Sequence, residues 1–368
     1  MNKQSSKSSQ SKASIVGTGL LALDVVINGN NYQLSRRWAG GTCGNVLIIL
    51  SYLEWNSYPV ARLNGETASK RVLKDLKRWG VHLDFAKSEP RVDTPIIIHK
   101  IIRREGGESV HKFSLKCPHC GSWLPTYRAV IASTAQRIAA RIDNPQVFFL
   151  DRVSRGSLLL AKACSEKGAL IVFEPSGIED PKLFREALDL THVLKYSKDR
   201  MHVLRTLPLS VRPLLEIETL GQEGLRYRSQ IASCASTGWQ RIDSYKISQV
   251  HDTAGSGDWC TAGVLHRLGQ GGLAKFQQTT PTELRDALRF GQALAAWNCG
   301  FEGARGGMYE VDRGRFEVGI TEIMSKDEPR TGSGLDPTEQ TQTVSQSLPK
   351  TKIVRITTPA QAQDACCF

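Results

Sequence analysis

Short apolar runs alternate with longer amphipathic stretches over most of the chain. The runs at 146–150, 169–174, 192–196 and 215–220 have the length and the β-branched or aromatic content of buried strands. The stretch 156–167, between the first two runs, carries apolar residues at helical spacing. Strands that alternate with helices form parallel sheets with both faces covered, so the pattern predicts an α/β fold.

One segment breaks this alternation. Two strand-like stretches, 94–104 and 109–116, flank the sequence Glu-Gly-Gly-Glu at 105–108, whose adjacent glycines suit a tight turn. We therefore expect a hairpin that projects from the main sheet.

A helix start is marked late in the chain. Thr280 is a good N-cap, Pro281 suits the first helical position, and Glu283 completes a capping box. The helix is expected to run from there towards Gly300.

The two ends of the chain differ in composition from the middle. Residues 1–13 and 323–368 are rich in Ser, Thr, Gln, Lys and Pro, which is typical of disordered tails. They leave one domain at 14–322, a length that large α/β domains reach. The sequence shows no apolar run of about 18 residues and no secretory signal, and its nine cysteines are an odd number. We expect a cytoplasmic protein with reduced thiols and no membrane partner.

The chain is strongly basic. Its 48 Lys and Arg residues exceed its 36 Asp and Glu residues, which gives a net charge of +12. Such a charge attracts polyanions, including nucleic acid. The basic residues are spread through predicted helices without interleaved aromatic residues, so a solvated surface is the simpler explanation. We expect no nucleic-acid partner.

The strongest chemical signal is the heptapeptide Asp-Thr-Ala-Gly-Ser-Gly-Asp at 252–258, which a helix of small residues follows. Gly255 and Gly257 let the backbone turn sharply and direct its N–H groups to one point, where a helix N-terminus concentrates positive charge. Asp258 lies on the first helical turn, beside this anion site. A carboxylate so placed suits proton removal from a hydroxyl during phosphoryl transfer. The alternative is a carboxylate that only offsets the helix dipole.

This heptapeptide and three further motifs resemble the ribokinase-like (PfkB) family of sugar and nucleoside kinases. The further motifs are 15–19 leading to Asp24, the glycine motif at 40–45, and the segment 218–224. Together they follow the family's order and spacing over roughly residues 14 to 320. The resemblance implies a three-layer α/β/α domain with a mostly parallel central sheet. It also implies a small β-sheet lid, built from residues near 25–37 and 92–117.

The resemblance further implies an activity. Members of the family transfer the γ-phosphate of ATP, with Mg²⁺ and in some cases a monovalent cation, to a hydroxyl of a sugar or nucleoside. The expected partner is therefore a small sugar or nucleoside substrate. An exposed lid edge invites pairing, so a homodimer through the lid is a further expectation.

The resemblance also assigns roles to individual residues. Asp258 is the general base, and the anion hole is formed by the backbone of Ala254, Gly255, Ser256 and Gly257. Substrate contacts fall on Asp24, Gly40, Gly41 and Asn45. Nucleotide contacts fall on Lys195, Ser197, Thr219, Gly221, Gly224 and Asn298. From the residues alone, Asn45 can instead cap a helix, Asp24 can lie in a turn, and the glycines can form ordinary turns.

The chain departs from the family at one element. Where the family carries Asn-x-x-Glu or Lys-x-Ser-x-x-Glu, this chain has Lys195, Ser197 and Arg200, with Asp199 as the nearby carboxylate. The family's Glu organises Mg²⁺ through water, so weaker metal recruitment is expected here. A ligand sensor that keeps the kinase fold but lacks efficient turnover is therefore an alternative function.

Cys117 and Cys120 lie in a Cys-Pro-His-Cys-Gly sequence that is similar to half of a zinc ribbon. A closed zinc site needs four ligands, which His111, His119 or the same pair from a second copy of the chain would have to complete. Two cysteines without metal are the simpler interpretation.

Overall fold

The computed structural model describes residues 12–29, 35–89, 92–103, 109–201, 204, 212–247 and 249–326. The expected turn at 105–108 lies outside the described residues. So does most of both expected tails, because the description begins at Lys12 and ends at Lys326.

The described residues contain a nine-stranded sheet with the order β13-β12-β11-β10-β9-β8-β1-β4-β5. Neighbouring strands are parallel from β5 to β11, whereas β12 and β13 are antiparallel additions at one edge. The four strands expected from the apolar runs are β8 to β11. The strands are β1 (Ser14–Thr18), β4 (Asn56–Leu63), β5 (Ala86–Ser88), β8 (Val147–Leu150), β9 (Leu170–Phe173), β10 (Val193–Ser197), β11 (Leu215–Thr219), β12 (Leu225–Ser229) and β13 (Gln240–Ile242).

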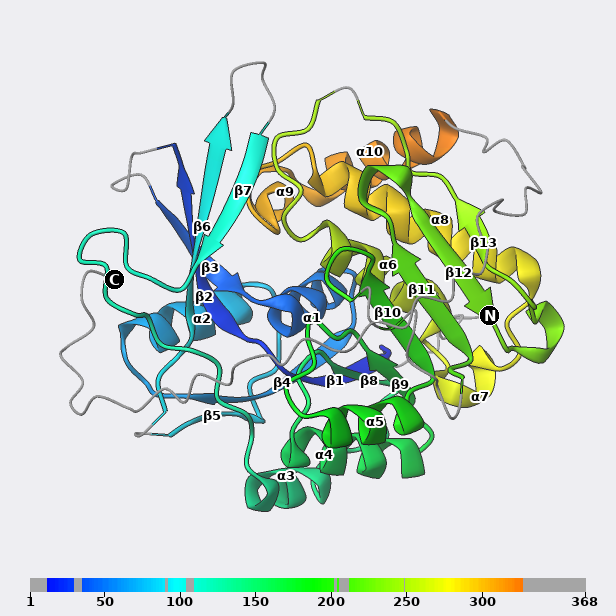
Figure 1. Cartoon of the computed structure of the whole chain (residues 1–368), viewed down its shortest axis with the longest axis horizontal. Helices are drawn as coiled ribbons and strands as arrows, with labels where there is room; N and C mark the ends of the chain where they lie inside the picture. Colours follow the sequence, from blue (N-terminus) through cyan, green and yellow to red (C-terminus); the bar gives the residue numbers. More distant parts are fainter. Residues whose placement is uncertain are drawn as a thin grey trace, which may run out of the picture.

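Helices cover both faces of this sheet, as Figure 1 shows. One layer consists of α3 (Ala132–Ala139), α4 (Arg155–Glu166) and α5 (Pro181–Leu190). The other contains α1 (Thr42–Tyr52), α2 (Thr67–Arg78), α6 (Ser256–Leu268), α8 (Pro281–Asn298) and α10 (Arg313–Lys326). Shorter turns are α7 (Gly272–Phe276), α9 (Gly306–Glu310), η3 (Gly221–Glu223) and η4 (Ala232–Cys234).

Alternate residues of each central strand pack into different layers. In β8, Phe148 and Leu150 join the core under α3 to α5, whereas Val147 and Phe149 join the core under α1, α6 and α8. All four side chains are buried, because both faces of a parallel sheet are covered. The α/β prediction is confirmed.

The expected helix near residue 280 is α8. The Thr280 side chain accepts a hydrogen bond from the Glu283 N–H, and the Glu283 side chain bonds back to the Thr280 backbone, which completes the predicted capping box. The last described helix, α10, continues to Lys326, past the domain end expected at 322.

A second sheet of four strands, with the order β3-β2-β6-β7, stands apart from the main sheet in Figure 1. Its strands are β2 (Ala22–Asn28), β3 (Arg36–Gly40), β6 (Ile96–Arg103) and β7 (Ser109–Ser114). It is the lid, and β6 and β7 form the expected hairpin. The strands β2 and β3 extend beyond the expected 25–37, because Ala22 pairs with Gly40 at the base of the lid.

Two short connections join the lid to the main body. The chain leaves β1 at Thr18 and enters β2 at Ala22, and β3 ends at Gly40 immediately before α1. In the first connection the Leu20 N–H donates to Asp151 Oδ1 at 2.8 Å. These connections fix the base of the lid beside the carboxyl ends of β1 and β8.

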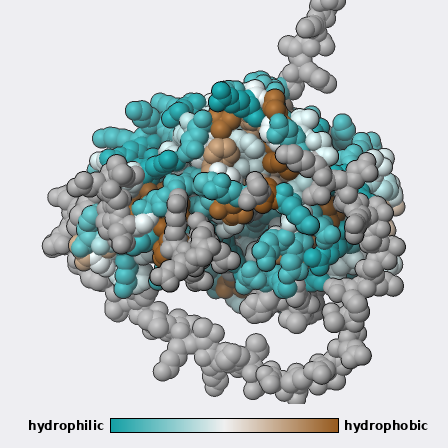
Figure 2. Space-filling model, turned by 90° about the horizontal axis from the view of Figure 1, so that it is seen from above, coloured by the Kyte–Doolittle hydropathy of each residue, from teal (hydrophilic) through white to brown (hydrophobic). Residues whose placement is uncertain are grey.

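The surface seen from above in Figure 2 is largely hydrophilic, with hydrophobic patches near its middle. No helix of the described ranges is both long and apolar enough to cross a membrane. The cysteines in the same ranges are unbridged.

Candidate active site

The heptapeptide forms the loop that leads into α6. Gly255 is the N-cap of this helix at φ 74°, and a Cβ atom there would lie 2.3 Å from the carbonyl oxygen of Ala304. Only glycine fits such a position, since the left-handed backbone and the close contact both exclude a side chain.

The backbone N–H groups of this loop divide into two sets. Ala254 N–H donates to Asp252 Oδ1 at 3.0 Å, and Ser256 N–H donates to the Thr253 carbonyl at 3.3 Å. Within the described residues, the N–H groups of Gly255 and Gly257 have no acceptor, as expected at a helix N-terminus. The loop itself thus uses two of the four N–H groups that were expected to bind an anion, and those of Gly255 and Gly257 are left.

Asp258 lies in the first turn of α6 and is only 9% exposed. Its Oδ2 atom accepts a hydrogen bond from Asn45 Nδ2 at 2.7 Å. Burial and the nearby Glu174 raise the pKa of Asp258 to about 8, although the hydrogen bond from Asn45 lowers it. The burial and the hydrogen bond of Asp258 distinguish it from an exposed carboxylate that only offsets the helix dipole.

Asn45 comes from α1, whose N-cap is Gly41 without a side-chain hydrogen bond. Asn45 is therefore not a cap, and its side chain reaches across to α6. Its Oδ1 atom accepts from Arg305 Nε at 2.9 Å. Both ends of the amide are used, which fixes which end faces Asp258.

Arg305 connects this pair to a further carboxylate. The guanidinium is 1% exposed and donates to Asp75 Oδ2 at 3.1 Å, while Tyr309 donates to the same oxygen at 2.7 Å. A continuous buried chain of contacts thus runs from Asp75 in α2 through Arg305 and Asn45 to Asp258.

Glu174 and Lys195 lie on the other side of Asp258. Lys195 Nζ donates to Glu174 Oε1 at 2.6 Å, and Thr261 Oγ1 of α6 donates to Oε2 at 2.5 Å. Lys195 is buried, and its positive charge lowers the pKa of Asp258 where Glu174 raises it. Lys195 also lies close to the start of α6, because a Cβ atom added to Gly257 would be 3.6 Å from Lys195 Nζ.

Asp24 lies in β2 on the lid side of the site. Its Oδ1 atom is buried without a hydrogen-bond partner in the described residues. Burial raises the pKa of Asp24 to about 7. A Cβ at Gly40 would lie 2.0 Å from Asp24 Oδ2, so this glycine leaves room for Asp24 itself. Gly41, at φ 78°, leaves room for the Leu20 carbonyl.

The expected nucleotide residues lie at the carboxyl ends of neighbouring strands. Ser197 ends β10 and Thr219 ends β11, where Thr219 Oγ1 donates to the Tyr196 carbonyl at 3.4 Å. Gly221 and Gly224 close the turn to β12, and Gly224 N–H donates to the Gly221 carbonyl at 3.1 Å. Ligands of open α/β sheets bind at this edge.

Asn298 contacts the backbone of the loop at residues 252–258. It is fully buried at the end of α8, and its Nδ2 donates to the Ala254 carbonyl at 3.0 Å. Its Oδ1 atom has no hydrogen-bond partner among the described residues. Asn298, expected as a nucleotide contact, thus contacts the backbone of the 252–258 loop.

Arg200 is exposed just beyond β10. Its charge is close enough to lower the pKa of Asp258. The position thus offers a cation to the site.

Cys117 and Cys120 form a tight turn in which Gly121 N–H donates to the Cys117 carbonyl at 2.9 Å. Among the described residues, the pair is not joined by a third His, Cys, Asp or Glu ligand within metal-binding reach. His111, one of the residues considered as a completing ligand, instead lies beside Asp252.

Glu174 and Arg305 belong to the site but were not expected from the sequence. Glu174 directly follows the apolar run of β9, at the strand end where ligands bind, and this is a signal that the sequence contains. Arg305 follows a glycine-rich segment and has no comparable signal, because its partners are more than 200 residues away.

No protein-family model matches the sequence, and neither does any curated protein. Solved structures do match. A ribokinase from Arabidopsis thaliana, complexed with ribose and ATP, has a TM-score of 0.61 and 16% identity over 85% of this chain and 99% of that one.

Two other matches are similar in extent. A nucleoside kinase from Burkholderia thailandensis, in complex with inosine, has a TM-score of 0.63 and 14% identity over 84% of this chain and 97% of that one. A fructokinase double mutant from Vibrio cholerae, bound to fructose, ADP and a potassium ion, has a TM-score of 0.62 and 17% identity over 85% and 99%. At these identities the likeness shows a shared fold.

Proposed function

We propose that this chain, which has the ribokinase-like fold, is an ATP-dependent kinase that phosphorylates a hydroxyl of a sugar, a nucleoside or a similar small molecule. One observation carries the proposal. A buried carboxylate, Asp258, stands at a helix N-terminus with unused N–H donors, next to the lid and the carboxyl edge of the parallel sheet. The names of the similar structures support the substrate class.

Asp258 is the proposed general base. Asn45 occupies its Oδ2 atom, which leaves Oδ1 for the substrate hydroxyl. In the reaction the hydroxyl oxygen bonds to the γ-phosphorus, its proton passes to Asp258, and the bond from phosphorus to the bridging oxygen of ADP breaks. The N–H groups of Gly255 and Gly257 would stabilise the charge on the transferring group.

The substrate side is assigned to Asp24, whose buried Oδ1 atom lacks a partner and suits a sugar or ribose hydroxyl. The nucleotide side is assigned to the strand ends that carry Ser197, Thr219 and Gly221. Mg²⁺ would neutralise the phosphate charge. Glu174 already accepts from Lys195 and Thr261, so such an ion would be held mainly by phosphates and water.

The experiment that tests the proposal is a panel assay of ADP release. The purified full chain is incubated with ATP, Mg²⁺ and sugars or nucleosides in turn, beside an Asp258→Asn variant. We expect substrate-dependent ADP from the natural chain and a loss of about two to four orders of magnitude in the variant. Equal rates in both proteins would contradict the role of Asp258.

A second function, a ligand sensor without efficient turnover, is favoured by Arg200 alone. A guanidinium repels Mg²⁺ but can itself bind phosphate. Tight nucleotide binding in calorimetry without ADP release for any member of the panel would support the sensor. An Arg200→Glu variant that then gains turnover would identify the residue responsible.

A further inference from the structure

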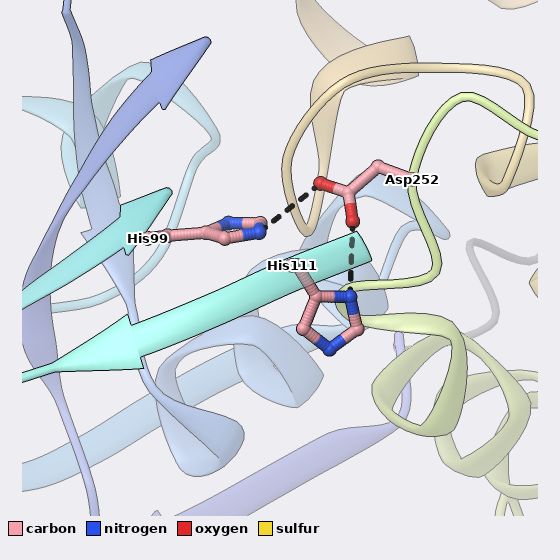
Figure 3. Close-up of side chains that lie close together, drawn as sticks. All are labelled: His99, His111 and Asp252. Atoms are coloured by element: carbon pink, nitrogen blue, oxygen red, sulfur yellow. Dashed lines mark ion pairs between the residues drawn. The ribbon is translucent and has the colours of Figure 1, made fainter. Parts of the chain in front are cut away.

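Three side chains with metal-binding chemistry converge where the lid meets the loop at residues 252–258 (Figure 3). His99 comes from β6, His111 from the neighbouring strand β7, and Asp252 from the first position of the heptapeptide. His99 Nε2 lies 3.4 Å from Asp252 Oδ2, and His111 Nδ1 lies 3.5 Å from Oδ1. With one atom from each residue, the set lies within 4.8 Å.

Asp252 is held as an anion in this position. Its two oxygens accept the N–H groups of Ala254 at 3.0 Å and Gly303 at 2.9 Å. Backbone N–H donors of this kind stabilise the ionised carboxylate. Each carboxylate oxygen keeps a second lone pair, so the hydrogen bonds leave capacity for a cation.

His99 supplies an independent indication. The ring is 1% exposed, and its Nε2 atom has no hydrogen-bond partner in the described residues even though Asp252 is near. A buried ring nitrogen without a hydrogen bond is costly unless something occupies the space beside it.

We propose that His99, His111 and Asp252 form a binding site for a divalent transition-metal ion of the zinc class. Ligand bonds of about 2.0 to 2.2 Å in a tetrahedron place neighbouring ligand atoms about 3.3 to 3.6 Å apart. The two histidine-to-aspartate distances, 3.4 Å to Oδ2 and 3.5 Å to Oδ1, fall in this range. Because they involve different oxygens, the ligand atoms, which lie within 4.8 Å of one another, would draw together around the ion. Two imidazoles with one carboxylate favour zinc over Mg²⁺, which prefers oxygen ligands.

The surroundings fit a three-ligand site with an open position. The side chain of His111 is 28% exposed, so water can reach the cluster from that side. Phe113 covers the two rings, with centroid distances of 4.9 Å to His99 and 5.1 Å to His111. The Thr253 hydroxyl, 3.2 Å from His111 Nδ1, competes for that nitrogen and would have to release it.

The bound ion would tie the lid hairpin to the loop that carries Asp258. This role does not depend on the proposed kinase reaction, because the ligands come from β6, β7 and residue 252 and not from the reacting groups. The rival arrangement is metal-free, with one histidine protonated against Asp252. The two arrangements differ in the affinity of the site for Zn²⁺ and in the visible absorption after Co²⁺ is added.

The test is a titration of the chelator-treated full chain with Zn²⁺ against a competing dye. We expect one tight site, with affinity lower by at least about a hundredfold in His111→Ala and in His99→Gln, because loss even of supporting groups costs 10- to 100-fold. His119→Ala and Cys120→Ser, in the nearby cysteine turn, are matched controls that should keep the affinity. Melting curves without metal identify any variant that fails to fold.

Cobalt provides the second measurement. Co²⁺ bound by two imidazoles and a carboxylate should give visible absorption without a sulfur-to-metal charge-transfer band, and His111→Ala should abolish that absorption. Zn²⁺ affinity that is the same in His111→Ala as in the natural chain would overturn the proposal. So would a sulfur band, or binding that disappears only in Cys120→Ser, since both would place the ion at the cysteine turn.

Discussion

The ionisation of Asp258 decides when it can act as a base. Burial and Glu174 raise its pKa, whereas the hydrogen bond from Asn45 and the charges of Lys195 and Arg200 lower it. The carboxylate therefore responds to each of these neighbours, and the response is measurable as a pH dependence.

We predict a rise of kcat/KM with pH up to about 8. As the proposed base, Asp258 can remove a proton only when ionised, so below its raised pKa of about 8 the active fraction should fall about tenfold per pH unit. In Asn45→Ala the hydrogen bond that lowers the pKa is absent, and the midpoint should move to higher pH. A pH profile of kcat/KM for both proteins measures the midpoint. A midpoint that moves to lower pH in the variant would show that the Asn45 hydrogen bond does not lower the pKa of Asp258.

Asp24 gives a stability prediction. Its folded-state pKa is raised from 3.8 to about 7, so its contribution is fully present below about pH 4 and is lost as the pH rises through 7. Asp24→Asn cannot lose that proton. From pH 5 to pH 8 the natural chain should therefore lose about 3 kcal/mol more unfolding free energy than the variant. Urea denaturation at both pH values measures the difference, and equal losses would show that Asp24 ionises freely in the fold.

At the scale of elements, the start of α6 depends on two glycines for different reasons. Gly255 has a left-handed backbone and a carbonyl in the place of its Cβ, whereas an added Cβ at Gly257 would meet only side-chain atoms at 3.6 Å and beyond. The turn requires glycine at position 255, whereas position 257 has room for a small side chain.

We therefore predict that alanine destabilises the fold strongly at one of these glycines and only weakly at the other. Gly255→Ala should lower the free energy of unfolding by about 2 to 4 kcal/mol, because left-handed strain adds to a backbone clash. Gly257→Ala, its matched control, should change stability by less than about 1 kcal/mol. Denaturant curves of the two variants decide the matter, and equal destabilisation would mean that the loop does not hold the described conformation.

Elements with a complete local signal were predictable. The strands β8 to β11 are continuous apolar runs, and α8 has its cap, proline and capping acid within four residues. The three-residue strands β5 and β13 were not expected, because each is too short to show a period and exists only through its pairing with a neighbour.

At the scale of the whole molecule, the site depends on contacts between distant parts of the chain. Asp258 was expected from the glycine loop at 252–258, and Asn45 and Asp24 were expected from the resemblance to a known family. Their mutual arrangement was not, since Arg305 and Asp75 join the site through contacts 230 and 260 residues apart in the sequence. Local patterns carry no information on such pairs.

The pair Arg305 and Asp75 gives a test at this scale. Both groups are largely buried, so Arg305→Met should lower the free energy of unfolding by about 3 to 5 kcal/mol by leaving a buried carboxylate uncompensated. The double variant with Asp75→Asn should cost less than the sum of the two single changes, by about 1 to 3 kcal/mol. Thermal and denaturant unfolding of the four proteins close the cycle, and strict additivity would exclude the pairing.

The two short connections decide which edge of the lid lies beside the main body. Because Ala22 pairs with Gly40, the two crossings lie side by side at the β2–β3 edge. The sheet order β3-β2-β6-β7 places β7 at the opposite edge. That strand carries His111 against Thr253 of the loop that leads to Asp258, so the lid meets this loop at the edge farthest from the two crossings.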